Sequence, residues 1–177
     1  MTFPETPAPP LHSPRVLGAA AAAAAFLLDQ AQKFWMLEVF GVAGRQPIRL
    51  TPFLDVTLSW NRGVSYSLLS AQGDVARYGL LALQVAIVAG LCLWLWRTPR
   101  RLTAFALGLI IGGALGNALD RLRFGAVADF FFFHTSLPVG PLANYVFNVA
   151  DALITLGVAL MLVDALWGAE GQADAEP

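Results

Sequence analysis

Residues 102–130 read LTAFALGLIIGGALGNALDRLRFGAVADF, an apolar run that ends in a dense group of polar side chains. The apolar part, about residues 102–119, is long enough to cross a bilayer as a helix. The polar part begins at Asn117 and ends at Asp129. Carboxylates next to lipid are costly, so a cluster of them at the edge of a membrane span indicates a functional site.

The composition of the whole chain also predicts a membrane protein. Its 177 residues are 57% hydrophobic and 13% charged, which is too apolar for an ordinary soluble domain of this size. Three other spans are predicted over about residues 16–40, 75–96 and 146–167. The expected fold class is therefore an α-helical integral membrane protein with a bundle of four transmembrane helices.

The segments between the spans differ in character. Residues 41–73 contain two prolines and short alternations such as Ile48-Arg49-Leu50, which predict a small extracytoplasmic β-rich subdomain. Residues 120–144 include the aromatic run Phe130–Phe133 without a clear period, and they predict a loop or short helix in the membrane interface. Residues 1–14 and 169–177 are expected to be disordered tails around a single domain.

Four spans that alternate in direction bring the polar motifs to one membrane face. The short turn Arg97–Arg101 lies on the opposite face, and its three arginines favour the cytoplasm. Both termini are therefore expected inside and the polar cluster outside. The residues expected to meet there are Asp29, Lys33, Asn61, Gly63, Asn117, Asp120, Arg121, Asp129, Asn148 and Asp151.

Asp129 and Asp151 are the residues expected to carry chemistry. Asp129 lies between Ala128 and Phe130, and this apolar setting should raise the pKa of its carboxyl by desolvation. Asp151 lies at the start of a helix, where the helix dipole favours the ionised form. Two carboxyls of which one tends to keep its proton and the other to be ionised can act as acid and base in aspartic-type hydrolysis. Because coupled groups titrate as a pair, assigning the proton to either one is a convention.

Each polar motif also fits a purely structural role, and the sequence leaves both explanations open. The structural roles are a helix cap for Asn148 and Asp151, an ion pair for Asp29 and Lys33, a polar span end for Asn117, Asp120 and Arg121, and a turn for Asn61–Ser67. In the functional alternative, the pair in the first span orients a substrate or the loop backbone, and Gly63 permits a close backbone approach.

Other classes of protein fit the sequence less well. A net charge of −1 gives no reason to expect a nucleic-acid partner, and two distant histidines do not support a His-rich metal site. A transporter or channel should have polar residues throughout the bilayer depth. The middles of spans two to four are instead almost wholly apolar, and Gln84 is the clearest exception. A structural bundle would not require two separate aspartates. A presenilin-type protease should show Tyr-Asp and Gly-x-Gly-Asp motifs, and this sequence has neither.

Taken together, the motifs resemble those of bacterial lipoprotein signal peptidase, the signal peptidase II family. The resemblance covers about residues 16–167, and two features depart from it. Tyr66 stands where the family usually has phenylalanine, and residues 135–146 replace a shorter stretch that commonly contains Trp/Phe-Pro. The matching pieces, in order, are Asp29-x-x-x-Lys33, NRGVSYS (61–67), GGALGNALDR (112–121), GAVADF (125–130) and FNVAD (147–151).

The resemblance implies one membrane peptidase domain over residues 15–168, an aspartic endopeptidase of the bacterial inner membrane. It implies Asp129 and Asp151 as catalytic residues and a membrane-anchored prolipoprotein as substrate, cut before a diacylglyceryl-modified cysteine. It also implies a globomycin-type inhibitor in the substrate site. No metal or organic cofactor is expected, and we expect a monomer. The residues expected around the site are Asp29, Lys33, Asn61, Gly63, Asn117, Asp120, Arg121 and Asn148.

Overall fold

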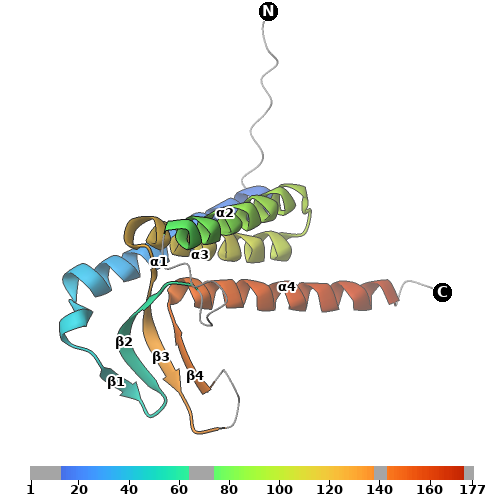
Figure 1. The fold of residues 1–177 in the computed structure, drawn as a ribbon. Helices are drawn as coiled ribbons and strands as arrows, with labels where there is room; N and C mark the ends of the chain where they lie inside the picture. The colour runs from blue at the N-terminus through green and yellow to red at the C-terminus, as the bar shows by residue number, and fades with distance from the viewer. Residues whose placement is uncertain (1–12, 64–73, 138–142, 174–177) are drawn as a thin grey trace, which may run out of the picture.

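A computed structural model describes residues 13–63, 74–137 and 143–173 of the chain (Figure 1). The predicted tails at residues 1–12 and 174–177 therefore lie outside the described residues. The helices are α1 (Pro14–Phe34), α2 (Asp74–Arg97), α3 (Arg101–Phe124) and α4 (Val149–Ala173), and α1 continues into a π-helical turn, Trp35–Val39. The strands are β1 (Ile48–Thr51), β2 (Leu54–Asn61), β3 (Val127–His134) and β4 (Asn144–Phe147).

Three of the described helices are long and apolar enough to cross a membrane, over Arg77–Arg97, Arg101–Phe124 and Val149–Trp167. They correspond to the predicted helices over residues 75–96, 102–119 and 146–167. The last prediction began too early, because residues 144–147 form a strand, and α4 continues beyond residue 167. Helix α1 is not among these three, and its role as a fourth span stays a prediction.

Helix α3 is the central helix, because glycines let its neighbours approach closely. Gly108, Gly112 and Gly116 are spaced by four, so they form one stripe, and this stripe faces α1. A Cβ added at Gly112 would lie 2.6 Å from the Cβ of Ala25, closer than two carbon atoms can pack. At Gly113 it would lie 2.7 Å from a backbone oxygen of α4. Small residues permit such close packing where lipid provides no hydrophobic drive between helices.

The strands form one antiparallel sheet in the order β1-β2-β3-β4. Figure 1 shows the sheet at one end of the helices, beside the end of α1 and the start of α4. Its core contains Met36, Val42, Val56, Ala128 and Phe130, so the turn after α1 packs directly against the sheet. The sheet is therefore anchored at the end of the bundle where α1 ends and α4 begins.

The prediction of a loop or short helix in the membrane interface over residues 120–144 was wrong. Residues 120–124 complete α3, and Val127–His134 form a central strand between β2 and β4. Both faces of this strand carry aromatic side chains, with Phe131 packed on Phe147 on one face and Phe132 beside His134 on the other, so Phe130–Phe133 shows no alternation in the sequence. The β-rich subdomain predicted over residues 41–73 supplies β1 and β2, and its residues 64–73 lie outside the described residues.

Candidate active site

The sheet positions Asp129. In the ladder between β2 and β3, Asp129 lies opposite Ser59, and Asn61 follows two residues later on the same face of β2. The Asn61 Nδ2 donates to Asp129 Oδ2 over 3.2 Å, and the Asp129 side chain is almost fully buried. A carboxyl that sequence reasoning placed in an interfacial loop is therefore held by a central strand.

The first turn of α4 positions Asp151. The Asn148 Oδ1 accepts the Asp151 N–H over 3.0 Å, and Asp151 Oδ2 accepts the Asn148 N–H over 3.2 Å. This reciprocal arrangement is a capping box, so the predicted helix-cap role is present. The second oxygen of Asp151 remains available and accepts from Asn117 Nδ2 on α3 over 2.9 Å.

Asn148 joins the two carboxylates, which we call the dyad. Besides capping α4, its Nδ2 donates to Asp129 Oδ1 over 2.6 Å and to Asn117 Oδ1 over 3.1 Å. Burial, and secondly the charge of Asp151, raise the pKa of Asp129 to about 6, although hydrogen bonds from Asn61 and Asn148 oppose this. Asp129 thus keeps its proton at a pH where an ordinary aspartate is ionised.

A buried ion cluster, the Lys33 cluster, lies next to the dyad. It consists of Asp29 and Lys33 on α1 and Asp120 on α3. The Lys33 Nζ lies 2.9 Å from Asp29 Oδ2 and 2.8 Å from Asp120 Oδ2, and it donates to Asn117 Oδ1 over 3.0 Å. All three members of the cluster are buried. The predicted i,i+4 pair of Asp29 and Lys33 is therefore present, within a larger network.

The same cluster also binds the backbone of both dyad segments. Asp29 Oδ1 accepts the N–H of Ala150 over 3.0 Å, and Asp120 Oδ2 accepts the N–H of Ala128 over 3.1 Å. Each alanine immediately precedes a member of the dyad. The structural and functional explanations of Asp29 and Lys33 are therefore compatible, since the ion pair holds the backbone that carries the carboxylates.

Arg121 lies near the dyad, close to Gly63. The Arg121 Nη1 donates to Gln84 Oε1 over 2.9 Å and to the Asn117 carbonyl over 3.4 Å, rather than to a dyad carboxylate. Gly63 has φ +90°, which favours glycine, and a Cβ there would meet Leu80 at 2.7 Å. Sequence reasoning noted Gln84 as a polar exception in its span but did not assign it to the site.

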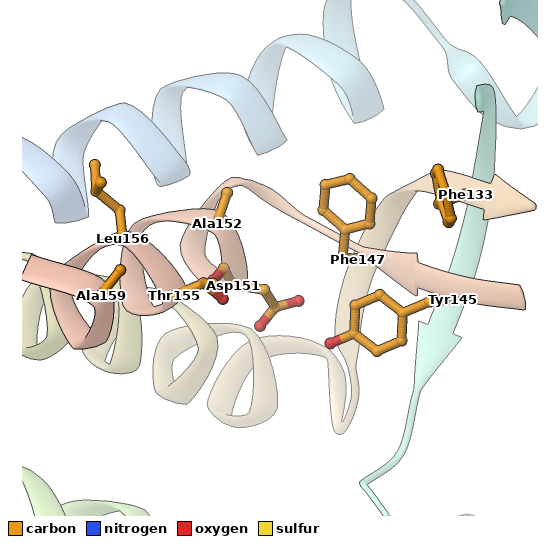
Figure 2. A pocket seen from close by; sticks show the side chains of 8 residues that line it. All are labelled: Phe133, Tyr145, Phe147, Asp151, Ala152, Thr155, Leu156 and Ala159. Atoms are coloured by element: carbon orange, nitrogen blue, oxygen red, sulfur yellow. The ribbon is translucent and has the colours of Figure 1, made fainter. Parts of the chain in front are cut away.

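A cavity of about 590 Å³ opens beside Asp151 (Figure 2). Aromatic side chains from β3 and β4 form one wall, and α4 forms the other. Sequence reasoning missed the contribution of Tyr145 and Phe147, because the register of β4 on β3 depends on long-range pairing. The lining residues are Phe133, Tyr145, Phe147, Asp151, Ala152, Thr155, Leu156 and Ala159.

The structure thus gathers the predicted residues at one end of the bundle, from both the helices and the sheet. Residues 64–67 of the motif that begins at Asn61 lie outside the described residues. Within the described ranges, no group of three or more His, Cys, Asp or Glu side chains is arranged to hold a metal ion. What the arrangement offers is a pair of buried carboxyls, fixed by amides, at the mouth of an apolar cavity.

Comparisons with known proteins agree with this arrangement. Residues 21–167 match the family model described as signal peptidase (SPase) II. A protein named lipoprotein signal peptidase from Methylocella silvestris is 57% identical over 159 residues, which are 90% of this chain and 91% of that protein. One of the same name from Beijerinckia indica subsp. indica is 51% identical over 158 residues, 89% of this chain and 92% of that protein.

A solved structure, described as a bacterial membrane enzyme, has the same fold with a TM-score of 0.70 and 24% identity. The match covers 87% of this chain and 90% of that one. At this identity the likeness shows a shared fold and nothing more. The family model and the two relatives, by contrast, match the amino-acid sequence of the chain. The match spans both dyad residues and most of the described helices and strands. The chain therefore belongs to the signal peptidase II family of bacterial membrane peptidases.

Proposed function

We propose that the protein is an aspartic endopeptidase that removes signal peptides from diacylglyceryl-modified prolipoproteins, cutting before the lipidated cysteine. The observation that carries the proposal is the dyad, in which Asn148 donates to the Asp129 carboxyl through its side-chain amide and to the Asp151 carboxyl through its backbone N–H. The names of the relatives, lipoprotein signal peptidase, support the class of substrate.

In the proposed mechanism the two carboxyls share one proton. Asp151, at the N-terminus of α4, is the ionised member, and it takes a proton from a water molecule that attacks the scissile carbonyl carbon. Asp129, whose pKa is raised to about 6, gives its proton to the carbonyl oxygen. The C–N bond then breaks as the departing amine takes the proton from Asp151 and the gem-diol returns one to Asp129. The cycle needs no metal or organic cofactor.

The residues around the dyad have positioning roles in this proposal. Asn61, Asn117 and Asn148 fix the carboxyl orientations, and the Lys33 cluster fixes the backbone that precedes each carboxyl. Arg121 contributes positive charge beside both carboxyls without neutralising either through a direct ion pair. Gly63 lets the end of β2 approach the site closely.

The cavity beside Asp151 is the proposed place of the membrane-anchored substrate. Its walls are almost wholly apolar, and it runs along α4 from the dyad toward Leu156 and Ala159. An apolar signal-peptide helix or an acyl chain fits such a surface, and a globomycin-type inhibitor would compete for the same space. The protein acts as a monomer in this proposal, because one chain supplies both carboxyls.

The proposed membrane orientation follows from the distribution of arginines. The helices α2 and α3 are joined by the turn that contains Arg97, Arg100 and Arg101, at the end of the bundle away from the sheet. A short arginine-rich turn favours the cytoplasm. Four spans with both termini inside would then place the dyad at the outer face of the inner membrane.

Cleavage of a diacylglyceryl-modified prolipoprotein peptide by detergent-purified protein tests the proposal. Asp129→Asn and Asp151→Asn should each reduce cleavage by at least about 10³-fold, because neither amide can exchange a proton with water or substrate. Asp55→Asn is the matched control, since Asp55 is a carboxylate on the same sheet that pairs with Arg49 and His134 instead.

The control variant should cleave at the wild-type rate. All three variants should purify as folded protein with thermal midpoints close to that of the wild type. Substantial cleavage by folded Asp129→Asn or Asp151→Asn protein would refute the assignment of the dyad. If the wild type did not cleave a lipidated substrate, the proposed activity itself would be refuted.

A further inference from the structure

The strand pairing places a tyrosine on the same sheet face as Asp129. Residues two apart on a strand share a face, so Phe131 and Phe133 lie on the Asp129 face of β3. Phe133 pairs with Tyr145 on β4, and cross-strand partners project to the same side. Tyr145 therefore faces the side of the sheet on which Asp129 lies.

The phenol of Tyr145 points toward the dyad. Figure 2 shows its oxygen directed at the carboxylate of Asp151, across the mouth of the cavity that both residues line. The ring is held by stacking on Phe147, with ring centroids 6.0 Å apart and ring planes 12° from parallel. Phe147 in turn packs on Phe131, 5.5 Å between centroids. The aromatic wall thus fixes the direction of the phenol.

The amide donors around the dyad are already engaged with carboxylate oxygens. Asn61 and Asn148 donate to Asp129, and Asn117 donates to Asp151. Tyr145 is 49% exposed, and its hydroxyl is directed at Asp151 from the side of the cavity that both residues line, where a substrate would lie. Burial and the charges of Asp151 and Asp129 raise the pKa of Tyr145, so the phenol remains a donor at any pH where the dyad works.

We propose that Tyr145 is a further catalytic residue of this peptidase, whose phenol donates a hydrogen bond to the scissile carbonyl oxygen as that oxygen gains charge. The inference rests on the proposed function. The phenol keeps its proton throughout, while Asp129 supplies the proton that the carbonyl oxygen receives. A donor directed at developing charge stabilises the transition state more than the ground state, so its effect should appear in kcat.

Tyr145→Phe tests this role, because it removes one oxygen atom and keeps the aromatic wall. With the diacylglyceryl-modified prolipoprotein peptide, kcat should fall by about tenfold or more while KM stays within about twofold. The shape of the pH–rate profile should not change, because the dyad keeps its own hydrogen bonds. Tyr78→Phe on α2 is the matched control, since Tyr78 is exposed and does not line the cavity. It should match the wild type in kcat and KM.

Three outcomes would overturn the inference while leaving the proposed function intact. The first is a Tyr145→Phe variant that cleaves like the wild type. The second is a rise in KM at unchanged kcat, which would make Tyr145 a wall of the cavity only. The third is a shift of the acidic limb of the pH–rate profile without loss of the maximal rate. That result would mean that the phenol donates its hydrogen bond to a dyad carboxylate and not to the substrate. A wild type that cleaves no lipidated substrate would instead overturn the proposed function and this inference together.

Discussion

At the scale of single residues, the carboxyl of Asp129 is subject to opposed influences. Burial, and then the charge of Asp151, raise its pKa, whereas hydrogen bonds from Asn61 and Asn148 stabilise the ionised form and lower it. The balance lies at about 6. If the dyad works with one shared proton, activity falls on the alkaline side when Asp129 loses that proton. On the acidic side it falls when the dyad as a pair takes up a second proton.

Asn61→Ala should therefore move the alkaline limb of the pH–rate profile to higher pH. Removing a donor to the ionised carboxylate leaves that form less stable, so the pKa of Asp129 rises. A hydrogen bond of about 1 kcal/mol corresponds to somewhat less than one pH unit. Measuring kcat/KM across pH would reveal the shift, with Thr57→Ala on the same strand as control. An alkaline limb that stays in place or moves to lower pH would contradict this account.

At the scale of elements, the contact between α1 and α3 depends on the glycine stripe of α3. Gly112→Ala places a methyl group 2.6 Å from the Cβ of Ala25, so the two helices must separate. Overpacking of this kind costs about 1–3 kcal/mol, and the thermal midpoint in detergent should fall by several degrees. Gly90→Ala on α2 is the control, because a Cβ there meets nothing within 4 Å. Equal midpoints for the two variants would show that the stripe does not set the helix distance.

The elements also show what could be predicted from the sequence and what could not. Long apolar runs identified α2, α3 and α4, since hydropathy over about 20 residues depends on local composition alone. The strand role of Phe130–Phe133 was missed, because a strand with aromatic side chains on both faces lacks the alternation of apolar and polar residues that marks a strand. The residues proposed for the site could be singled out by their motifs, but the hydrogen bonds between them could not be predicted. The pairing of Asp29 with the Ala150 backbone joins segments 121 residues apart.

At the scale of the whole molecule, the Lys33 cluster links nearly every part of the fold that carries the dyad. It joins α1 to α3 through the ion pairs, and it reaches β3 and α4 through the N–H groups of Ala128 and Ala150. One buried lysine thus compensates two buried carboxylates. A displacement of α1, α3 or α4 would be transmitted to the dyad segments through this network.

Lys33→Met should therefore destabilise the protein severely, because it leaves Asp29 and Asp120 buried without a counter-charge. Removing one partner from a buried ion pair costs about 3–5 kcal/mol, whereas replacing the whole group with neutral side chains is often nearly neutral. The triple variant Lys33→Met/Asp29→Asn/Asp120→Asn should then recover most of the lost thermal midpoint in detergent. Its two asparagine oxygens can still accept the N–H groups of Ala150 and Ala128. Cleavage should consequently be detectable in the triple variant and absent from Lys33→Met alone. A triple variant as unstable as the single one would mean that the ion pairs themselves, rather than the backbone hydrogen bonds they support, hold the dyad segments in place.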